Sequence, residues 1–461
     1  MPAHPIDFQI NANVFGTQEL TQIFEEKAVF QRWLDFEAAL AETQGEMGII
    51  PLEAAQDIAQ KAHLENLDLD FISEGYGKSR NSVIPLLGGL RRACSKDNGE
   101  FVHYGATTQD VLDTGEMLSI RASVAIVYRD LRDFEDICIR MARQHRTTPM
   151  AARTHGQQAL PTTFGLKVSV WLGEIRRHIE RIKLLYPSLC YGQLGGAVGT
   201  MAALGPLAVE ISIKTLGKLG LEHDIASWHT ARDRVAEVSS IFSILTMTLA
   251  KIANEVFQLQ KTEISELAEP PPSGALASST MPHKRNPVIC QRVIALSKHV
   301  RALNGTIIES MSHEHERDPR SLWAEWLAVP QLCIYTGTCL QYMNDVMSGL
   351  SVEAEKMKEN LYRQRDFITT EWLLFQLSDS MGKMRSLEKL HKLTGIANDK
   401  GLSLADVLLS DAETGKLFTR EQLSMLDNPE RYNGHAVVIV DQVVENVEQK
   451  RRSDPENLAD S

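Results

Sequence analysis

Five long stretches of helically spaced apolar residues constrain the fold of this chain more than any other feature. Each carries an apolar stripe at three- and four-residue steps over roughly 20 to 30 residues, as Phe242, Leu245 and Leu249 illustrate. The stretches cover residues 107–146, 164–185, 232–267, 286–311 and 323–350. Helices of this length cannot bury such stripes against a small core, so they must pack on one another, within a bundle or between subunits. The sequence therefore predicts an all-α protein built on a central bundle of long helices.

The segments before and after the long stretches have a different character. Shorter helical patterns cover residues 18–46, 52–63 and 84–94, and after residue 363 the patterns shorten again and glycine recurs. No stretch rich in strand-forming alternation stands out. We therefore predict three helical domains. They are an N-terminal domain over residues 1–106, the central five-helix bundle domain over 107–363 with a loop at 273–287, and a small C-terminal domain over 364–461.

The composition limits the classes of partner and the compartment. The chain has 461 residues and a formal net charge of -12, from 60 acidic and 48 basic side chains, which argues against a nucleic-acid or membrane-surface partner. No apolar run reaches the roughly 20 residues that span a bilayer, and the N-terminus lacks the blocks of a signal peptide, so we expect a cytoplasmic protein. None of the six cysteines forms a Cys-x-x-Cys pair or lies at ligand spacing from a histidine, so we expect reduced thiols and no metal site.

Two short polar stretches each come directly before a long helical stretch. The first covers residues 103–110, where the hydroxyls of Thr107 and Thr108 precede a predicted helix, and such a helix N-terminus is a ready anion site. The alternative is a simple helix cap by one of these threonines. The second covers residues 153–158 and contains His155. A lone histidine is more often structural than catalytic, but the polar neighbours and the adjacent glycine place this one better for polar chemistry.

A third stretch, at residues 273–287, has a first half that should be flexible and a second half that should be rigid. Its first half is rich in small residues, which favour a mobile loop, and its second half has Pro282 and Pro287 five residues apart. Between these prolines lie a cation, Lys284, and an amide, Asn286. Hydroxyls on a flexible arm beside a pinned cation predict a lid that closes on an anionic substrate, with an ordinary surface loop as the alternative.

The amino-acid sequence of this loop resembles a family signature. Residues 278–287 read Ser-Ser-Thr-Met-Pro-His-Lys-Arg-Asn-Pro, which resembles the pattern Gly-Ser-Ser-x-Met-Pro-x-Lys-x-Asn-Pro of the fumarase/aspartase superfamily, with Ala277 in place of the leading glycine. The other two polar stretches match the superfamily at their expected places, so the resemblance covers nearly the whole chain. It implies a homotetramer whose active sites are each built from three subunits, and it implies no cofactor.

The resemblance also implies a reaction and roles for individual residues. The shared reaction is an anti elimination across a succinyl unit, usually releasing fumarate, through a dianion that needs cations and aimed donors. In this scheme Ser278 is the base, His155 is the general acid, and His103 lies near it. The residues implied to bind the substrate are Thr107, Thr108, Gln109, Thr154, Lys284 and Asn286, and we add Arg317 and Arg320 as further candidates for binding an anion.

Two branches of the superfamily compete. Residues 228–234 and 314–326 are similar to bacterial 3-carboxy-cis,cis-muconate cycloisomerases. Those enzymes typically have tryptophan where His155 stands, and Thr-His-Gly-Gln at residues 154–157 is the form of adenylosuccinate lyases. However, Trp326 stands where adenylosuccinate lyases have an arginine, and an indole cannot replace a bidentate phosphate partner.

We therefore predict a lyase that cleaves a C–N or C–O bond of a succinyl-type di- or tricarboxylate. One alternative is the lactonising 3-carboxy-cis,cis-muconate cycloisomerase, and another is adenylosuccinate lyase. A further alternative is a non-catalytic scaffold of the kind that some superfamily members form as lens crystallins. The presence of Ser278, Lys284, Asn286 and His155 argues against a scaffold.

Overall fold

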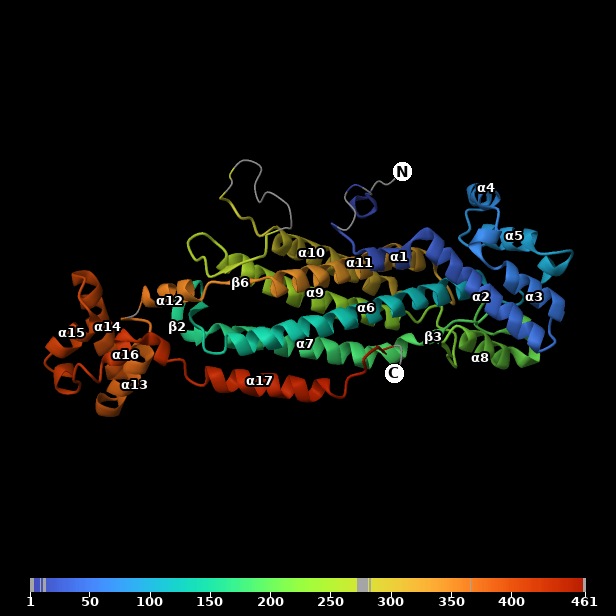
Figure 1. Ribbon diagram of the computed structural model, residues 1–461. Helices are drawn as coiled ribbons and strands as arrows, with labels where there is room; N and C mark the ends of the chain where they lie inside the picture. The colour runs from blue at the N-terminus through green and yellow to red at the C-terminus, as the bar shows by residue number, and fades with distance from the viewer. Residues whose placement is uncertain are drawn as a thin grey trace.

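The protein is an elongated all-α molecule. The computed structural model describes residues 4–8, 10, 14–271, 281, 283–364 and 366–458. Within these residues it has seventeen α-helices and six short strands, which confirms the predicted fold class. A bundle of long helices occupies the middle, shorter N-terminal helices lie at one end, and most C-terminal helices lie at the other (Figure 1).

The bundle consists of the five predicted long helices. They are α6 (Thr108–Gln144), α7 (Phe164–Leu185), α9 (Asp233–Leu259), α10 (Val288–Ser310) and α11 (Pro319–Ser348). With 37 residues, α6 is about 55 Å long. The predicted boundaries hold within four residues, except that α9 stops eight residues early. It stops there because the side chain of Gln260 binds the chain beyond it, accepting from the N–H of Glu269 and donating to the carbonyl of Arg285.

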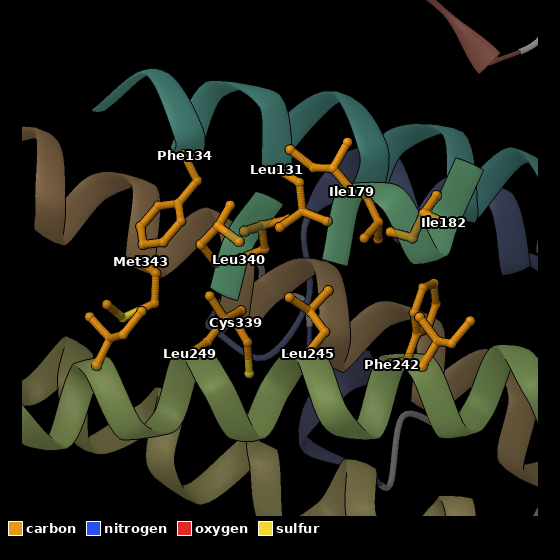
Figure 2. Packing of buried hydrophobic residues seen from close by; sticks show 14 of the residues in the cluster. Leu131, Phe134, Ile179, Ile182, Phe242, Leu245, Leu249, Cys339, Leu340 and Met343 are labelled. Carbon is orange, nitrogen blue, oxygen red and sulfur yellow. The ribbon is translucent and has the colours of Figure 1, made fainter. Parts of the chain in front are cut away.

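The apolar stripes of these helices meet in one core. Figure 2 shows side chains from α6, α7, α9 and α11 packed against one another, and Phe134, Ile179, Leu245 and Leu340 among them are fully buried. Cutting such a side chain back to alanine costs about 2–5 kcal/mol. By length and composition α9 could also cross a membrane, with a mean hydropathy of 1.5, but 67% of that window is buried inside the fold. Its composition is therefore explained by its place in the bundle core.

The N-terminal helices form a second core. They are α1 (Gln18–Phe24), α2 (Glu26–Glu46), α3 (Leu52–Lys61), α4 (Leu69–Ser79) and α5 (Ile84–Ala93). The helix predicted over 18–46 is broken at Glu25, whose ψ of 143° is extended. This break lets α1 pack on α6 and α11. The second core also takes in Leu194, Leu204 and Ile211, the last on α8 (Ala208–Lys218), which come from later in the chain than the predicted N-terminal domain.

The C-terminal helices divide between a third core and the bundle. They are α12 (Ala354–Tyr362), α13 (Thr370–Met381), α14 (Lys383–Lys400), α15 (Leu404–Ser410), α16 (Ser424–Asp427) and α17 (Ala436–Arg451). Helices α13 to α15 share their own apolar cluster, whereas α17 returns along α7 (Figure 1). Just beyond α17, the fully buried carboxylate of Asp454 pairs with Arg176 and Lys183, both at 2.8 Å. The division into three domains therefore remains a prediction.

The strands occur in three small pairs. β1 (Pro149–Thr154) and β2 (Gln157–Thr163) form an antiparallel hairpin between α6 and α7, which the sequence analysis did not predict. β3 (Tyr191–Gly192) pairs in parallel with β4 (Glu222–His223), and β5 (Leu267–Ala268) pairs with β6 (Ser351–Val352) in antiparallel fashion. The β1–β2 hairpin is the pair that bears on the candidate site, because it contains the second predicted polar stretch, residues 153–158.

Candidate active site

The first predicted stretch forms a cradle at the N-terminus of α6. Thr107 is the residue that precedes the helix, and Thr108 and Gln109 begin it. The buried carboxylate of Asp110 accepts hydrogen bonds from the N–H groups of Thr107, Gly195 and Gly196 at 2.8–3.0 Å. It therefore fixes the start of α6 against the loop at residues 195–196. Thr107 therefore occupies the cap position that the sequence analysis offered as the alternative, and the anion site at this helix end remains a prediction.

A cavity of about 310 Å³ opens at this cradle. Thr107, Thr108, Gln109 and Arg317 all line it, and Arg317 Nη1 donates to Thr107 Oγ1 at 3.3 Å. A guanidinium beside helix N–H groups and hydroxyls is suited to binding a carboxylate. Arg320 is not in the cavity lining. Its guanidinium pairs instead with Asp318 at 2.8 Å and with Glu314 at 2.7 Å, so its role in substrate binding remains a prediction.

A buried charge cluster forms one wall of the cavity. The Arg232 side chain is 1% exposed and binds Asp113 at 2.9 Å, Glu325 at 3.0 Å and Glu116 at 3.4 Å. Its guanidinium also lies 5.1 Å from the ring of Trp228. Burial, and then the charge of Glu325, hold the pKa of Glu116 well above its ordinary value.

His103 lies close to the cradle in sequence and has an acidic partner. Its Nδ1 is 2.7 Å from Glu37 Oε1, and the Glu37 side chain is 2% exposed. Burial acts to lower the pKa of His103, but the charge of Glu37 and its hydrogen bond outweigh burial, so the pKa is raised. The backbone of His103 is left-handed, with φ of 62°.

The second stretch is the turn of the β1–β2 hairpin. Thr154 and Gln157 are paired, so His155 and Gly156 form a two-residue loop, and their φ values of 52° and 76° are those of a type I′ turn. His155 is exposed at this tip. The pairing of an X-Gly dipeptide with flanking polar residues is a hairpin signal that the sequence analysis missed.

The hairpin is fixed beside its turn by a buried ion pair. Arg153 donates to Glu266 at 2.6 and 2.9 Å, and the Glu266 side chain is fully buried. Asn360 Nδ2 also donates to Glu266, at 2.8 Å. The exposed His155 therefore sits on a rigid support.

The third stretch lies only partly within the described residues. Ser278, the predicted base, lies outside them, whereas Lys284 and Asn286 line a cavity of about 660 Å³. Glu269 closes the base of this loop, because its carboxylate accepts from the N–H groups of Ile289 and Cys290 at 3.1 Å each, in the first turn of α10.

Among the described residues, the first stretch lies far from the hairpin and from the loop of Lys284 in the same chain. Thr107 lies at one end of α6 and the hairpin follows its other end, about 55 Å away along the helix. Arg232 at the start of α9 contacts the cavity wall, whereas Gln260 just beyond its other end contacts the loop of Lys284, a separation of about 40 Å. Neither span fits a small polycarboxylate.

Known proteins resemble this chain over most of its length. A family described as lyase matches residues 15–302, which is more than half of the chain. The chain belongs to the fumarase/aspartase superfamily. Within it, the N-acetyl-S-(2-succino)cysteine lyase of Dickeya dadantii is 37% identical over 444 residues, covering 96% of this chain and 98% of that protein.

Two other superfamily members represent the branches considered above. The adenylosuccinate lyase of Methanocaldococcus jannaschii is 34% identical, covering 98% of this chain and 97% of that protein. The crystal structure of 3-carboxy-cis,cis-muconate lactonizing enzyme from Pseudomonas putida aligns with a TM-score of 0.88 and 31% identity, covering 94% of this chain and 98% of that one. Membership in a superfamily of lyases and cycloisomerases confirms the prediction of an enzyme of this class.

Several cavity residues were missed from the sequence. Arg80, Asp113 and Glu116 line the cavity but were not proposed as site residues. Asp113 and Glu116 lie four and seven residues after Gln109, on the same helix face, and this spacing was the available signal. Arg80 comes from the left-handed end of α4, with φ of 50°, and only the tertiary structure brings it here.

Proposed function

We propose that this enzyme catalyses the β-elimination of a succinyl adduct, releasing fumarate and the group bonded to the succinyl carbon. The observation that carries the proposal is the cradle at the start of α6, where hydroxyls, helix N–H groups and Arg317 line one cavity. In such an elimination the negative charge grows on the carboxylate next to the carbon that loses its proton. Donors and cations aimed at that carboxylate are what the reaction requires.

The proposed mechanism assigns one step to each group. Ser278, as an alkoxide, takes the proton from the carbon next to the carboxylate, and the electron pair forms the dianion. This pair then makes the C=C bond of fumarate while the bond to the leaving atom breaks, and His155 gives that atom a proton. Lys284, Asn286 and Thr154 would hold the carboxylate oxygens. The atoms and charges balance without a redox partner, and the absence of a cofactor remains a prediction.

We infer that each active site is completed by other copies of the chain, as a homotetramer would allow. The support is the span of about 55 Å between the cradle and the hairpin of one chain, together with the exposure of His155. The test is to mix Ser278→Ala and His155→Asn proteins under conditions that exchange subunits, using an adduct with a poor leaving group, for which both variants alone should show little activity. Random mixing should return activity to about a quarter of the sites. No recovery after demonstrated exchange would contradict a site that takes Ser278 and His155 from different chains.

The leaving group is the open part of the proposal. The predictions from the sequence named nitrogen and oxygen, and the relative from Dickeya dadantii adds sulfur, because its name describes a succinyl thioether. Lactonisation is a second candidate, supported by the likeness to the lactonizing enzyme from Pseudomonas putida. We place the enzyme in the cytoplasm, where six free cysteines would stay reduced.

The deciding experiment uses three substrates and one control variant. The wild-type protein and Ser278→Ala are incubated with N-acetyl-S-(2-succino)cysteine, adenylosuccinate and 3-carboxy-cis,cis-muconate, and the products are followed by proton NMR. Fumarate from either adduct, absent with Ser278→Ala, supports the elimination and names its leaving atom. A lactone from the muconate supports the second candidate instead. Equal turnover by Ser278→Ala would show that the base is another residue.

A further inference from the structure

The cavity at the start of α6 continues along that helix from the cradle to a group of acidic side chains. Gln109, Asp113 and Glu116 follow at steps of four and three residues, so they share one helix face, and all three line the cavity. At about 1.5 Å per residue, Glu116 lies roughly 13 Å from Thr107 along the helix. A succinyl carboxylate held at the cradle would therefore place the rest of an adduct over Asp113 and Glu116.

Two buried oxygen atoms in this part of the cavity lack partners. Asp113 Oδ2 and Glu116 Oε1 have no hydrogen-bond partner among the described residues. The Asp113 side chain is 1% exposed, and its other oxygen already accepts from Gln109 Nε2 at 2.8 Å and Arg232 Nη1 at 2.9 Å. Buried polar atoms are rarely left unsatisfied, and an exception calls for an explanation such as a bound group. In the ionised carboxylates both atoms are acceptors, so the group that would satisfy them is a hydrogen-bond donor.

The charges of the cluster exclude one common type of leaving group. Asp113, Glu116 and Glu325 surround the single guanidinium of Arg232, so this cluster offers no cation to a further anion. The other arginines of the cavity lining are Arg317, at the cradle, and Arg80, at the end of α4. A phosphate placed here would face carboxyl groups at short range, which is unfavourable in a buried site. An N–H donor would instead satisfy the free oxygens. The cluster therefore distinguishes these two kinds of leaving group by charge.

Two indoles provide an apolar surface in the same cavity. Trp323 is 60% exposed and Trp326 is 43% exposed, and both line it, with the ring of Trp326 6.5 Å from that of Trp33. Large exposed aromatic side chains at a cavity commonly mark a binding surface. We propose that this end of the cavity is the leaving-group subsite, and that it selects a leaving group carrying an N–H donor beside an apolar part and rejects one carrying phosphate. This inference rests on the proposed function.

The test measures binding separately from turnover. Four succinyl thioethers are made from N-acetylcysteamine, cysteamine, N-acetyl-N-methylcysteamine and 2-mercaptoethyl phosphate, and their binding to full-length Ser278→Ala protein is measured by calorimetry. The first two carry N–H as an amide or an ammonium group, and the last two carry none. We expect at least one N–H adduct to bind about tenfold tighter than the N-methyl adduct, with the phosphate adduct weakest. Equal binding of all four, tightest binding of the phosphate adduct, or no binding would overturn the inference.

A second arm assigns the preference to the cluster. In a Ser278→Ala background, Glu116→Met should remove most of the N–H preference, Glu116→Gln should restore it because its amide still offers an acceptor, and Glu445→Met on the outer face of α17 should change nothing. Folding is checked by circular dichroism. An unchanged preference in Glu116→Met would overturn the assignment. Turnover is a separate readout, because wild-type protein that binds the adducts selectively but releases no fumarate would contradict the proposed function alone.

Discussion

The two ends of the central bundle present their functional residues in opposite ways. At the start of α6, the cradle residues are half-buried or buried and are tied to Asp110 and to the Arg232 cluster. At the other end, His155 and Lys284 are exposed, and what is buried is the support beneath them, Glu266 and Glu269. One end of the chain therefore holds its candidate site residues in a buried, tightly bonded setting, whereas the other end exposes them above a buried support. Four predictions test this contrast.

The largest expected effect is on the buried end. Arg232→Met should lower the free energy of unfolding by about 3–5 kcal/mol, because it leaves Asp113 and Glu325 as buried charges without their partner. Urea unfolding followed by circular dichroism measures it. Arg234→Met is the matched control, since Arg234 lies two residues further along the chain. Its side chain is 21% exposed, pairs with the partly exposed Asp224 and lies 4.7 Å from the ring of Tyr191. Equal destabilisation by both variants would contradict the prediction that the buried cluster of Arg232 contributes more to stability than a partly exposed ion pair.

The next effect separates activity from stability at the exposed end. His155→Asn should reduce turnover by about 100-fold with poor leaving groups, because those need a proton in the transition state, while the unfolding free energy stays unchanged. The measurement is kcat and KM for adducts whose leaving groups differ in pKa. A loss of the same size for every leaving group would make His155 a binding residue.

A smaller effect is expected from the support beneath the loop. Glu269→Ala should raise KM about tenfold, because the first turn of α10, directly after Asn286, loses two hydrogen bonds to a carboxylate. The KM of Glu269→Gln, which keeps a hydrogen-bond acceptor, should lie between the KM of Glu269→Ala and that of the wild type. Steady-state kinetics provides the measurement. A fall in kcat at constant KM would mean that Glu269 does not act through substrate binding.

The smallest effect concerns His103 and pH. Because the pKa of His103 is raised in the folded protein, its protonated form stabilises the fold below the ordinary pKa of about 6.5, and this contribution is lost as pH rises through the raised value. Glu37→Gln removes the charge that raises it. The variant should therefore be less stable than the wild type by about 1 kcal/mol at low pH, with the gap closing as pH rises. Urea unfolding across pH, with NMR titration of the ring, measures this, and a constant gap would contradict it.

The helix-bundle class and the ends of most long helices could be predicted from the sequence alone. Period-3.6 stripes of 20 residues or more cannot be buried any other way, so α7 was predicted to the residue and the other long helices to within a few residues, apart from the end of α9. The cradle could be predicted because a helix N-terminus is a local feature. The roles of the predicted site residues remain predictions.

Only the tertiary structure decided where those stretches lie relative to one another. The early end of α9 depends on Gln260 binding Glu269 and Arg285, which are 9 and 25 residues further along the chain. The acid cluster depends on Arg232 meeting residues from α6 and α11, more than 90 positions away. Local spacing predicts which face a side chain occupies, but burial and unmatched charge arise only when distant helices pack together. That packing, and not the motif, created the leaving-group end of the cavity.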